Sequence, residues 1–169
     1  MRKVALIVLV ALLSGCATGD SSNTSFSADD QLFAAMMIPH HQQAIEMSDL
    51  ALGNSTDPEI IALAQEIKAA QGPEIEQMKS WGSSHMGSHA GHMMDEGMLS
   101  DDEMAQLKSS KRAEFDRLFL EGMIKHHQGA IEMADMILDS MNQQAVSLGK
   151  SIVESQNAEI ARMRQLLRR

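Results

Sequence analysis

The chain has 169 residues, and its 14 Lys and Arg against 23 Asp and Glu give a formal net charge of -9. This length corresponds to about one domain. The acidic balance argues against a protein that follows nucleic-acid phosphates. With no Tyr, one Trp and four Phe, the chain also has almost no aromatic surface on which bases stack. Its unusual feature is 15 Met and seven His beside a single Cys, a composition rich in metal ligands other than thiols.

The beginning of the chain predicts export and lipidation. Two basic residues precede an apolar run over residues 4–13, which is too short to span a bilayer as a mature helix. The run ends in Leu13-Ser14-Gly15-Cys16, an order that resembles the bacterial lipobox, in which cleavage leaves the Cys as an acylated N-terminus. We therefore expect residues 1–15 to be a signal peptide, Cys16 to carry lipid, and residues 16–25 to be a tether.

Lipidation at Cys16 has two consequences for function. The protein would lie in the cell envelope, anchored to a membrane on the periplasmic or another extracytoplasmic face. Its only thiol would be consumed, so that a disulfide, a thiolate metal ligand and a cysteine nucleophile are all excluded. Any soft metal site must then be built from Met and His.

A duplicated segment organises the rest of the chain. Residues 37–47, MIPHHQQAIEM, recur as residues 123–133, MIKHHQGAIEM. A second pattern, Q-x-x-E-I-x-x-M, begins at Gln71 and again at Gln156. Each half of the chain therefore contains one His-His segment followed by one copy of the second pattern, as expected for an internal duplication.

Both patterns have the period of helices with one buried face. The first His-His segment carries a stripe through Phe33, Met37, His40, Ala44, Met47 and Ala51, and the second carries Phe119, Met123, His126, Ala130, Met133 and Ile137. Similar stripes run from Ile60 to Trp81 and from Ala145 to Leu166. Helix-starting residues at Ser27, Asp57 and Ser100 agree with these stripes. We predict an all-α protein, an up-down four-helix bundle built from two duplicated hairpins.

The boundaries follow from the same signals. The bundle covers residues 26–169, with the first hairpin at 26–81, a His- and Met-rich linker at 82–99 and the second hairpin at 100–169. No segment shows the alternation of period two that is typical of a strand.

Antiparallel pairing within each hairpin predicts a polar layer halfway along the bundle. His40 comes level with Gln71 and near Glu74, and the second half places His126 likewise. The residues brought to the two histidines, with the methionines that follow on the same stripes, are Gln71, Glu74, Met78, Gln156, Glu159 and Met163. They either complete a metal site and orient its histidines, or form a structural hydrogen-bond network that fixes the register. The sequence leaves both explanations open.

The His-His segments are the first candidate metal site. Met37 stands three and four residues before His40 and His41, and Met123 has the same spacing to His126 and His127, so these side chains can meet on adjacent turns. Thioether and imidazole together suit Cu(I) and Ag(I), because soft cations prefer such ligands. The competing interpretation is that Met fills the core and His is a hydrogen-bonded core residue.

The linker is a second, accessory candidate. Its Gly- and Ser-containing stretch carries His85, Met86, His89, His92, Met93, Met94 and Met98. This composition is typical of a metal-capturing tract. The alternative is a loop with chance His content.

The duplicated F-x3-M-I-x-H-H-Q-x-A-I-E-M and Q-x-x-E-I-x-x-M patterns resemble the bacterial family known as domain of unknown function 305, over nearly the whole chain from Phe26 to Leu167. The resemblance implies a ferritin-like four-helix bundle and, in the CopM-like members, copper binding through Met and His with a role in copper resistance. The positions that match are Met37, His40, His41, Met47, Met123, His126, His127 and Met133.

The sequence therefore predicts a lipid-anchored extracytoplasmic protein that binds Cu(I), and also Ag(I), for sequestration or transfer to a partner protein. Copper is preferred over zinc or iron, and the spacing Glu-x-x-His of a di-iron site is absent. No catalytic residues are identified, so an enzyme is not expected. The alternative is a lipoprotein that binds other proteins and no metal, in which the layer of His, Gln and Glu is a buried hydrogen-bond network.

Overall fold

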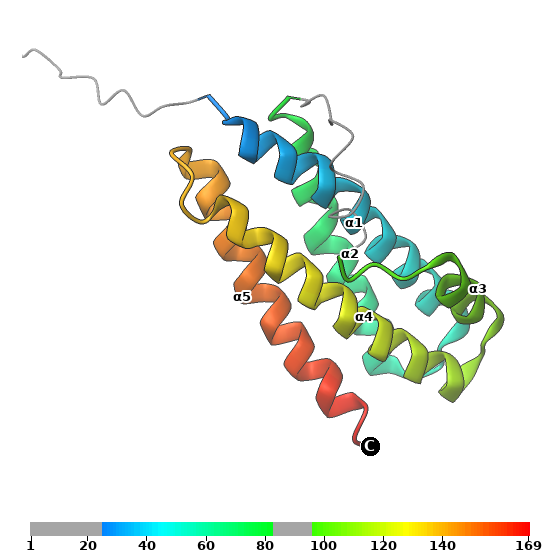
Figure 1. Cartoon of the computed structure of the whole chain (residues 1–169). Coiled ribbons are helices and arrows are strands. Elements are labelled where there is room, and N and C mark those ends of the chain that lie inside the picture. Colours follow the sequence, from blue (N-terminus) through cyan, green and yellow to red (C-terminus); the bar gives the residue numbers. More distant parts are fainter. Residues whose placement is uncertain (1–24, 83–95) are drawn as a thin grey trace, which may run out of the picture.

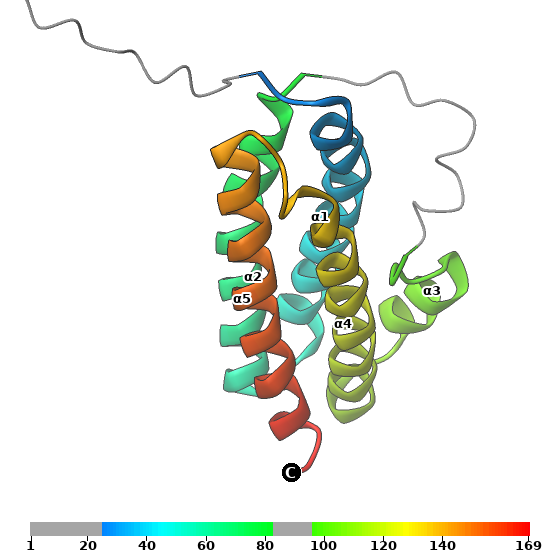
Figure 2. The same ribbon diagram turned by 60° about the vertical axis from the view of Figure 1, so that its left-hand side comes forward.

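The computed structural model describes residues 25–82 and 96–169, and every regular element in these residues is helical. In chain order the elements are α1 (Ala28–Asn54), α2 (Pro58–Lys79), α3 (Asp101–Ser109), α4 (Arg112–Ala134), the short 3-10 helix η2 (Asp135–Ile137) and α5 (Gln143–Leu166). The four long helices α1, α2, α4 and α5 form a bundle, and α3 lies outside it at one end (Figures 1 and 2). The predicted all-α bundle is confirmed.

The helices begin where the sequence places their caps. The Ser27 hydroxyl accepts a hydrogen bond from the Asp30 N–H, and the Asp30 carboxylate accepts one from the Ser27 N–H. Ser100 and Glu103 make the same reciprocal pair at α3, and Asp57 caps α2. These bonds satisfy N–H groups that a helix leaves without partners in its first turn.

Contacts at the helix ends fix the direction of each helix. Asp30, at the start of α1, accepts a hydrogen bond from Ser140 beyond the end of α4, while Lys111 just before α4 donates to Asn54 at the end of α1. Helices α1 and α4 are therefore antiparallel. Since each hairpin is antiparallel as well, α2 and α4 run in the same direction, so α2 ends and α4 begins at opposite ends of the bundle (Figure 2). A parallel pair of consecutive long helices is the feature of ferritin-like bundles, which have one crossover connection.

The hydrophobic core consists of two separate clusters. One contains Phe33, Ala34, Met36, Met37, Met78, Trp81, Ala130, Met133, Ala134, Ile137, Ala145, Leu148 and Ile152. The other contains Ala44, Met47, Ala51, Ile60, Leu63, Ala64, Ile67, Leu99, Met104, Leu107, Phe115, Phe119, Leu120, Met123, Ile160, Met163 and Leu166. Between them lie buried polar residues, none more than 2% exposed: His40, His41, Gln71, His126, His127 and Gln156. We refer to these six as the polar layer.

Helix α3 is an element that the sequence analysis did not separate from the second hairpin. It ends because the hydroxyls of Ser109 and Ser110 donate to the carbonyls of Gln106 and Leu107, a local bonding pattern that competes with continuation of a helix. The chain then turns through Arg112, whose φ is 55°. Two side chains of α3, Met104 and Leu107, are buried in the core.

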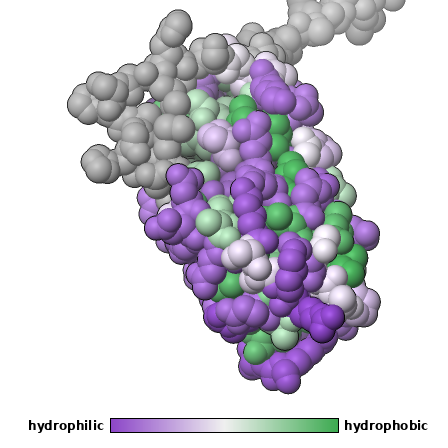
Figure 3. Space-filling model, turned by 90° about the vertical axis from the view of Figure 1, so that its right-hand side faces the viewer, coloured by the Kyte–Doolittle hydropathy of each residue, from purple (hydrophilic) through white to green (hydrophobic). Residues whose placement is uncertain are grey.

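The surface is mainly hydrophilic on the face shown in Figure 3. Among the described residues, the exposed large hydrophobic side chains are Leu52, Met141 and Leu167. No helix in this part of the chain is long and apolar enough to cross a membrane.

Candidate metal centre

The four histidines of the duplicated segments are completely buried at the middle of the bundle. His40 and His126, from α1 and α4, face each other with ring centroids 3.7 Å apart and planes at 37°. We call them the inner pair. The centroids of His41 and His127 lie 6.5 and 6.2 Å from those of their inner neighbours, because consecutive residues of a helix point about 100° apart. We call His41 and His127 the outer pair.

Each histidine of the outer pair contacts a carboxylate from the second helix of its own hairpin. His41 Nε2 lies 2.8 Å from Glu74 Oε2, and His127 Nε2 lies 2.5 Å from Glu159 Oε2. The carboxylate side chains are 15% and 17% exposed, so each one reaches from a buried ring toward solvent. The sequence predicted that Glu74 lies near His40. The residue that contacts Glu74 is the adjacent His41, because consecutive positions of α1 face different neighbours.

The inner pair donates to backbone carbonyls. His40 Nε2 lies 3.0 Å from the carbonyl oxygen of Glu96, and His126 Nε2 lies 2.9 Å from the carbonyl oxygen of His40. A carbonyl accepts and cannot donate, so in both rings Nε2 must carry the hydrogen.

Both inner histidines are neutral in the folded protein at ordinary pH. Burial, followed by the neighbouring His41, lowers the pKa of His40 to about 3. Burial also holds the pKa of His126 well below its ordinary value, and the adjacent His40 and His127 act in the same direction. A neutral ring that carries its hydrogen on Nε2 has a lone pair on Nδ1.

The Nδ1 atoms find no partner among the described residues. All four histidines of the layer have a buried Nδ1 without a hydrogen bond to any described residue, and the same holds for both amide atoms of Gln71 and Gln156. A buried polar atom without a partner costs about 1 to 3 kcal/mol. The described residues therefore give each ring of the layer a partner at Nε2, and they give none to the four Nδ1 atoms or to the two amides.

Both core clusters contain methionines that the sequence assigned to the site. Met37, Met78 and Met133 belong to the first cluster, and Met47, Met123 and Met163 belong to the second. Each trio takes residues from both halves of the duplication. Among the described residues, no three side chains of His, Cys, Asp or Glu converge closely enough to hold a metal ion. A metal bound in this layer would need thioether or amide ligands beside the imidazoles.

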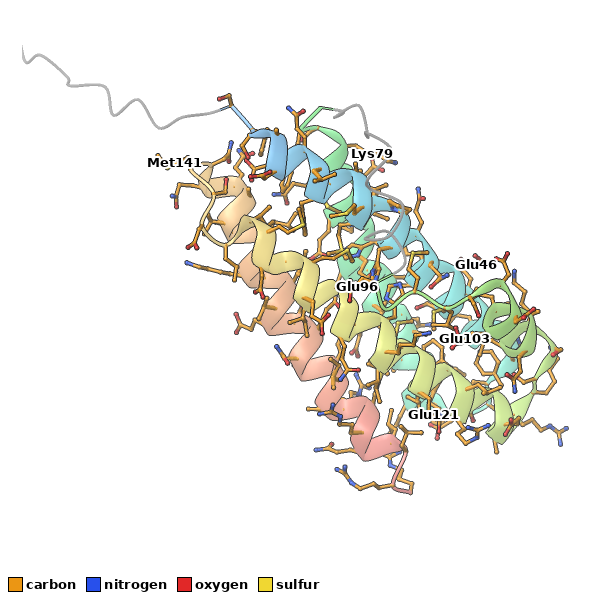
Figure 4. All side chains as sticks on the ribbon, viewed as in Figure 1. Glu46, Lys79, Glu96, Glu103, Glu121 and Met141 are labelled. Atoms are coloured by element: carbon orange, nitrogen blue, oxygen red, sulfur yellow. The ribbon has the colours of Figure 1, made fainter. Side chains whose placement is uncertain are left out.

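Sequence reasoning missed the residues that cover His40. We define residues Glu96–Leu99 as the strap, which lies across α1 and α4 near the middle of the bundle (Figure 4). Gln43 of α1 bonds both backbone groups of Leu99, and Glu96 supplies the carbonyl that faces His40. A signal was present in the sequence, because Gln43 is one of two positions at which the duplicated segments differ.

The remaining predicted residues fall into two groups. Met98 lies on the strap and is half-buried. The predicted signal peptide, Cys16 and the linker ligands His85, Met86, His89, His92, Met93 and Met94 lie outside the described residues.

Comparison with known families gives one match over most of the chain. Residues 30–167 match the family described as Domain of unknown function (DUF305). The chain belongs to this family. Comparison with curated proteins finds no match.

Solved structures give the same relationship. A DUF305 fragment from Deinococcus radiodurans is 30% identical, with 85% of this chain and 97% of that chain covered and a TM-score of 0.73. A DUF305 protein from Streptomyces coelicolor is 31% identical, with coverage of 83% and 92% and a TM-score of 0.76. CopM in a Cu(I)-bound form is 32% identical, with coverage of 82% and 95% and a TM-score of 0.67. CopM is also known in Cu(II)-bound, Ag-bound and apo forms.

Proposed function

We propose that this protein binds Cu(I), and also Ag(I), in the polar layer, for sequestration or transfer in copper homeostasis. The observation that carries the proposal is the bonding of the four buried histidines. Each has an oxygen acceptor at Nε2 and no partner for Nδ1 among the described residues. Histidines that bind metals commonly donate their second ring nitrogen to a carbonyl or carboxylate, which fixes the ring and aims the free nitrogen at the ion.

The inner pair is the centre of the proposed site. Its rings are neutral, face each other and lie on both halves of the duplication, so they are ready to bind a metal without losing a proton. The methionine trios supply soft ligands within about two helical turns of the layer. Met37 and Met123 are the nearest in sequence, one turn before the inner pair.

The relatives support the choice of metal. CopM, at about one-third identity over most of both chains, binds Cu(I), Cu(II) and Ag. The ligand set favours Cu(I) over Cu(II), zinc or iron in this chain, because the layer is buried and its extra donors are sulfur rather than carboxylate.

The location and partners are part of the proposal. The leader, the lipobox-like Leu13–Cys16 and the Ser-rich tether favour a lipid-anchored protein on an extracytoplasmic face. The His and Met residues between positions 85 and 94 would capture the ion before it reaches the bundle, and a second protein would receive it. No catalysed reaction is proposed.

The competing function is a purely structural layer in a protein-binding lipoprotein. The two His–Glu contacts favour it, since they satisfy the outer pair without metal. Eight buried atoms of the layer have no partner in the described part of the chain. They argue against this function, because a structural network that leaves so many buried polar atoms open is less stable than an apolar core.

An anaerobic Cu(I) competition titration tests the proposal. We compare the protein with a variant carrying His40→Ala and His126→Ala, and with a control in which His85, His89 and His92 become Ser. The proposal predicts tight binding that survives in the control and falls at least a hundredfold in the inner-pair variant. Equal affinity of the protein and the inner-pair variant would exclude a site in the polar layer.

A further inference from the structure

The strap is held against the bundle by two side chains of α1, Gln43 and His40, and by its own buried Leu99. Gln43 Nε2 donates to the Leu99 carbonyl at 2.9 Å, and the Leu99 N–H donates to Gln43 Oε1 at 2.8 Å. This pair of bonds anchors the strap to α1. Met98, the residue before Leu99, is half-buried. Glu96, at the other end of the strap, has an exposed side chain.

The strap lies directly on the backbone of α4. Gly97 has a φ of +73°, and a Cβ built there would lie 2.7 Å from the Lys125 carbonyl oxygen. A Cβ at Gly129 would lie 2.3 Å from the Glu96 carbonyl oxygen. Only glycine at position 129 therefore leaves room for the carbonyl that accepts from His40.

The duplicated segments differ where the strap touches them. Over residues 37–47 and 123–133 the two copies differ only at Pro39, which corresponds to Lys125, and at Gln43, which corresponds to Gly129. Gln43 binds the strap, Gly129 makes room for it, and the Lys125 carbonyl lies beneath Gly97. Gln43 and Gly129, the two residues of one differing position, thus both serve a segment that has no counterpart in the duplication.

Of the two inner histidines, only His40 bonds to the strap. His40 reaches out of the bundle to the Glu96 carbonyl, whereas His126 donates inward to the His40 carbonyl. Removal of the strap would uncover Nε2 of His40 and leave the bond of His126 in place. Of the inner pair, His40 is therefore the residue that a movement of the strap would expose.

We propose that the strap Glu96–Leu99 is the gate to the polar layer and that Gln43 is its latch, so that a small soft cation enters and leaves on the His40 side. Side-chain hydrogen bonds and one buried apolar side chain, Leu99, hold this segment. Segments with so few buried apolar contacts open at lower free energy than helices packed along their length. The nature of the cation rests on the proposed function. The existence of the gate does not.

Two pairs of variants test the gate without metal. Gln43→Ala removes the latch, and Gln42→Ala, at an exposed position of the same helix, is its control. Gly129→Ala places a Cβ where the Glu96 carbonyl lies, and Gly72→Ala, a helical glycine with nothing within 4 Å of its added Cβ, is its control. Urea unfolding of all four variants identifies those that remain folded to the same extent as the parent protein.

The readout is the rate at which diethyl pyrocarbonate modifies each histidine of the metal-free protein, located by peptide mass spectrometry. Loss of two ordinary hydrogen bonds predicts an increase of about thirtyfold for His40 in Gln43→Ala. A comparable increase is expected in Gly129→Ala and none in either control. Unchanged labelling of His40 in the two opened variants would overturn the gate. So would faster labelling of His41 or His127 than of His40, which would place the entrance beside Glu74 or Glu159.

The rate at which Ag(I) is released to a competing chelator then tests whether the cation passes through the gate. Both opened variants should release Ag(I) faster in proportion to their labelling of His40, with the controls unchanged. Faster labelling with unaltered release would show that the cation uses another path and would overturn its part of the proposal. If the parent protein takes up no Ag(I) or Cu(I), the proposed function fails, and the labelling still decides whether the strap is a gate.

Discussion

His40 and His126 donate to backbone carbonyls and face each other across the bundle, whereas His41 and His127 each contact a carboxylate of their own hairpin. The members of each His-His dipeptide are neighbours in sequence, yet the inner residue is closed off by main chain and the outer one is linked to partly exposed Glu. One duplicated dipeptide therefore provides two chemical environments, because consecutive helix positions face different partners.

The largest difference between the pairs is expected in the pH dependence of stability. The unfolded chain binds protons at His40 and His126 below about pH 6.5, while burial keeps both neutral in the folded protein. The stability they contribute is therefore present above pH 6.5 and is lost as the pH falls toward 3. Two such groups lower the free energy of unfolding by about 4 kcal/mol between pH 8 and pH 5. Urea unfolding of the metal-free protein at a series of pH values measures this loss.

A variant with His40→Leu and His126→Leu is the control for that measurement. It should lose this part of the pH dependence, since Leu does not titrate. The same slope in the variant and the parent protein would assign the acid sensitivity to other groups and contradict the neutral inner pair.

The pairs should also differ in their contribution to Cu(I) affinity. We expect His126→Ala to weaken binding at least a hundredfold, which corresponds to about 2.7 kcal/mol. The substitution removes one proposed ligand, the ring that faces His40. We expect His127→Ala to weaken binding by about tenfold. Competition with a chromophoric Cu(I) chelator under anaerobic conditions measures both. The reverse order would move the site from the inner pair to the outer pair.

Much of the fold was predictable from the sequence. The stripes through Phe33 and Phe119, the caps at Ser27 and Ser100 and the level of the polar layer all follow from helical period and hairpin length. These features depend on distances along the chain, which a single hairpin fixes. The structure bears them out.

The partner of each histidine was not predictable in the same way. Whether His40 or His41 meets Glu74 depends on the rotation of α1 about its axis, and packing against α4 sets that rotation. The strap was missed because it belongs to neither copy of the duplication. The difference between Gln43 and Gly129 was visible in the sequence. It can be explained only when the structure shows that both residues contact the strap.

A smaller loss of Cu(I) affinity is expected when an outer histidine loses its carboxylate partner. Glu74→Gln keeps the size of the side chain but removes the charge that orients His41. We expect Cu(I) affinity to fall about tenfold. Glu76→Gln, at an exposed position of the same helix, should change it less than twofold. Equal effects of the two substitutions would exclude a positioning role for Glu74.

The smallest expected effect concerns the amides of the layer. Gln71→Leu and Gln156→Leu each replace a buried amide without described partners by an apolar side chain of similar size. The free energy of unfolding of the metal-free protein should rise by about 1 kcal/mol for each. Urea unfolding beside the exposed-site control Gln77→Leu checks this. A loss of more than 1 kcal/mol would support a structural network in which the amides take part.

The most direct test of the account is the protonation of the inner histidines. Long-range ¹H–¹⁵N spectra of protein labelled at His distinguish a ring nitrogen that carries hydrogen from one that carries a lone pair. For His40 and His126 we expect hydrogen on Nε2 in the metal-free protein. When Ag(I) is added, we expect the largest change at Nδ1, with hydrogen retained on Nε2. Hydrogen on Nδ1 in the metal-free protein, or spectra of the inner pair that do not respond to Ag(I), would contradict the proposed metal site.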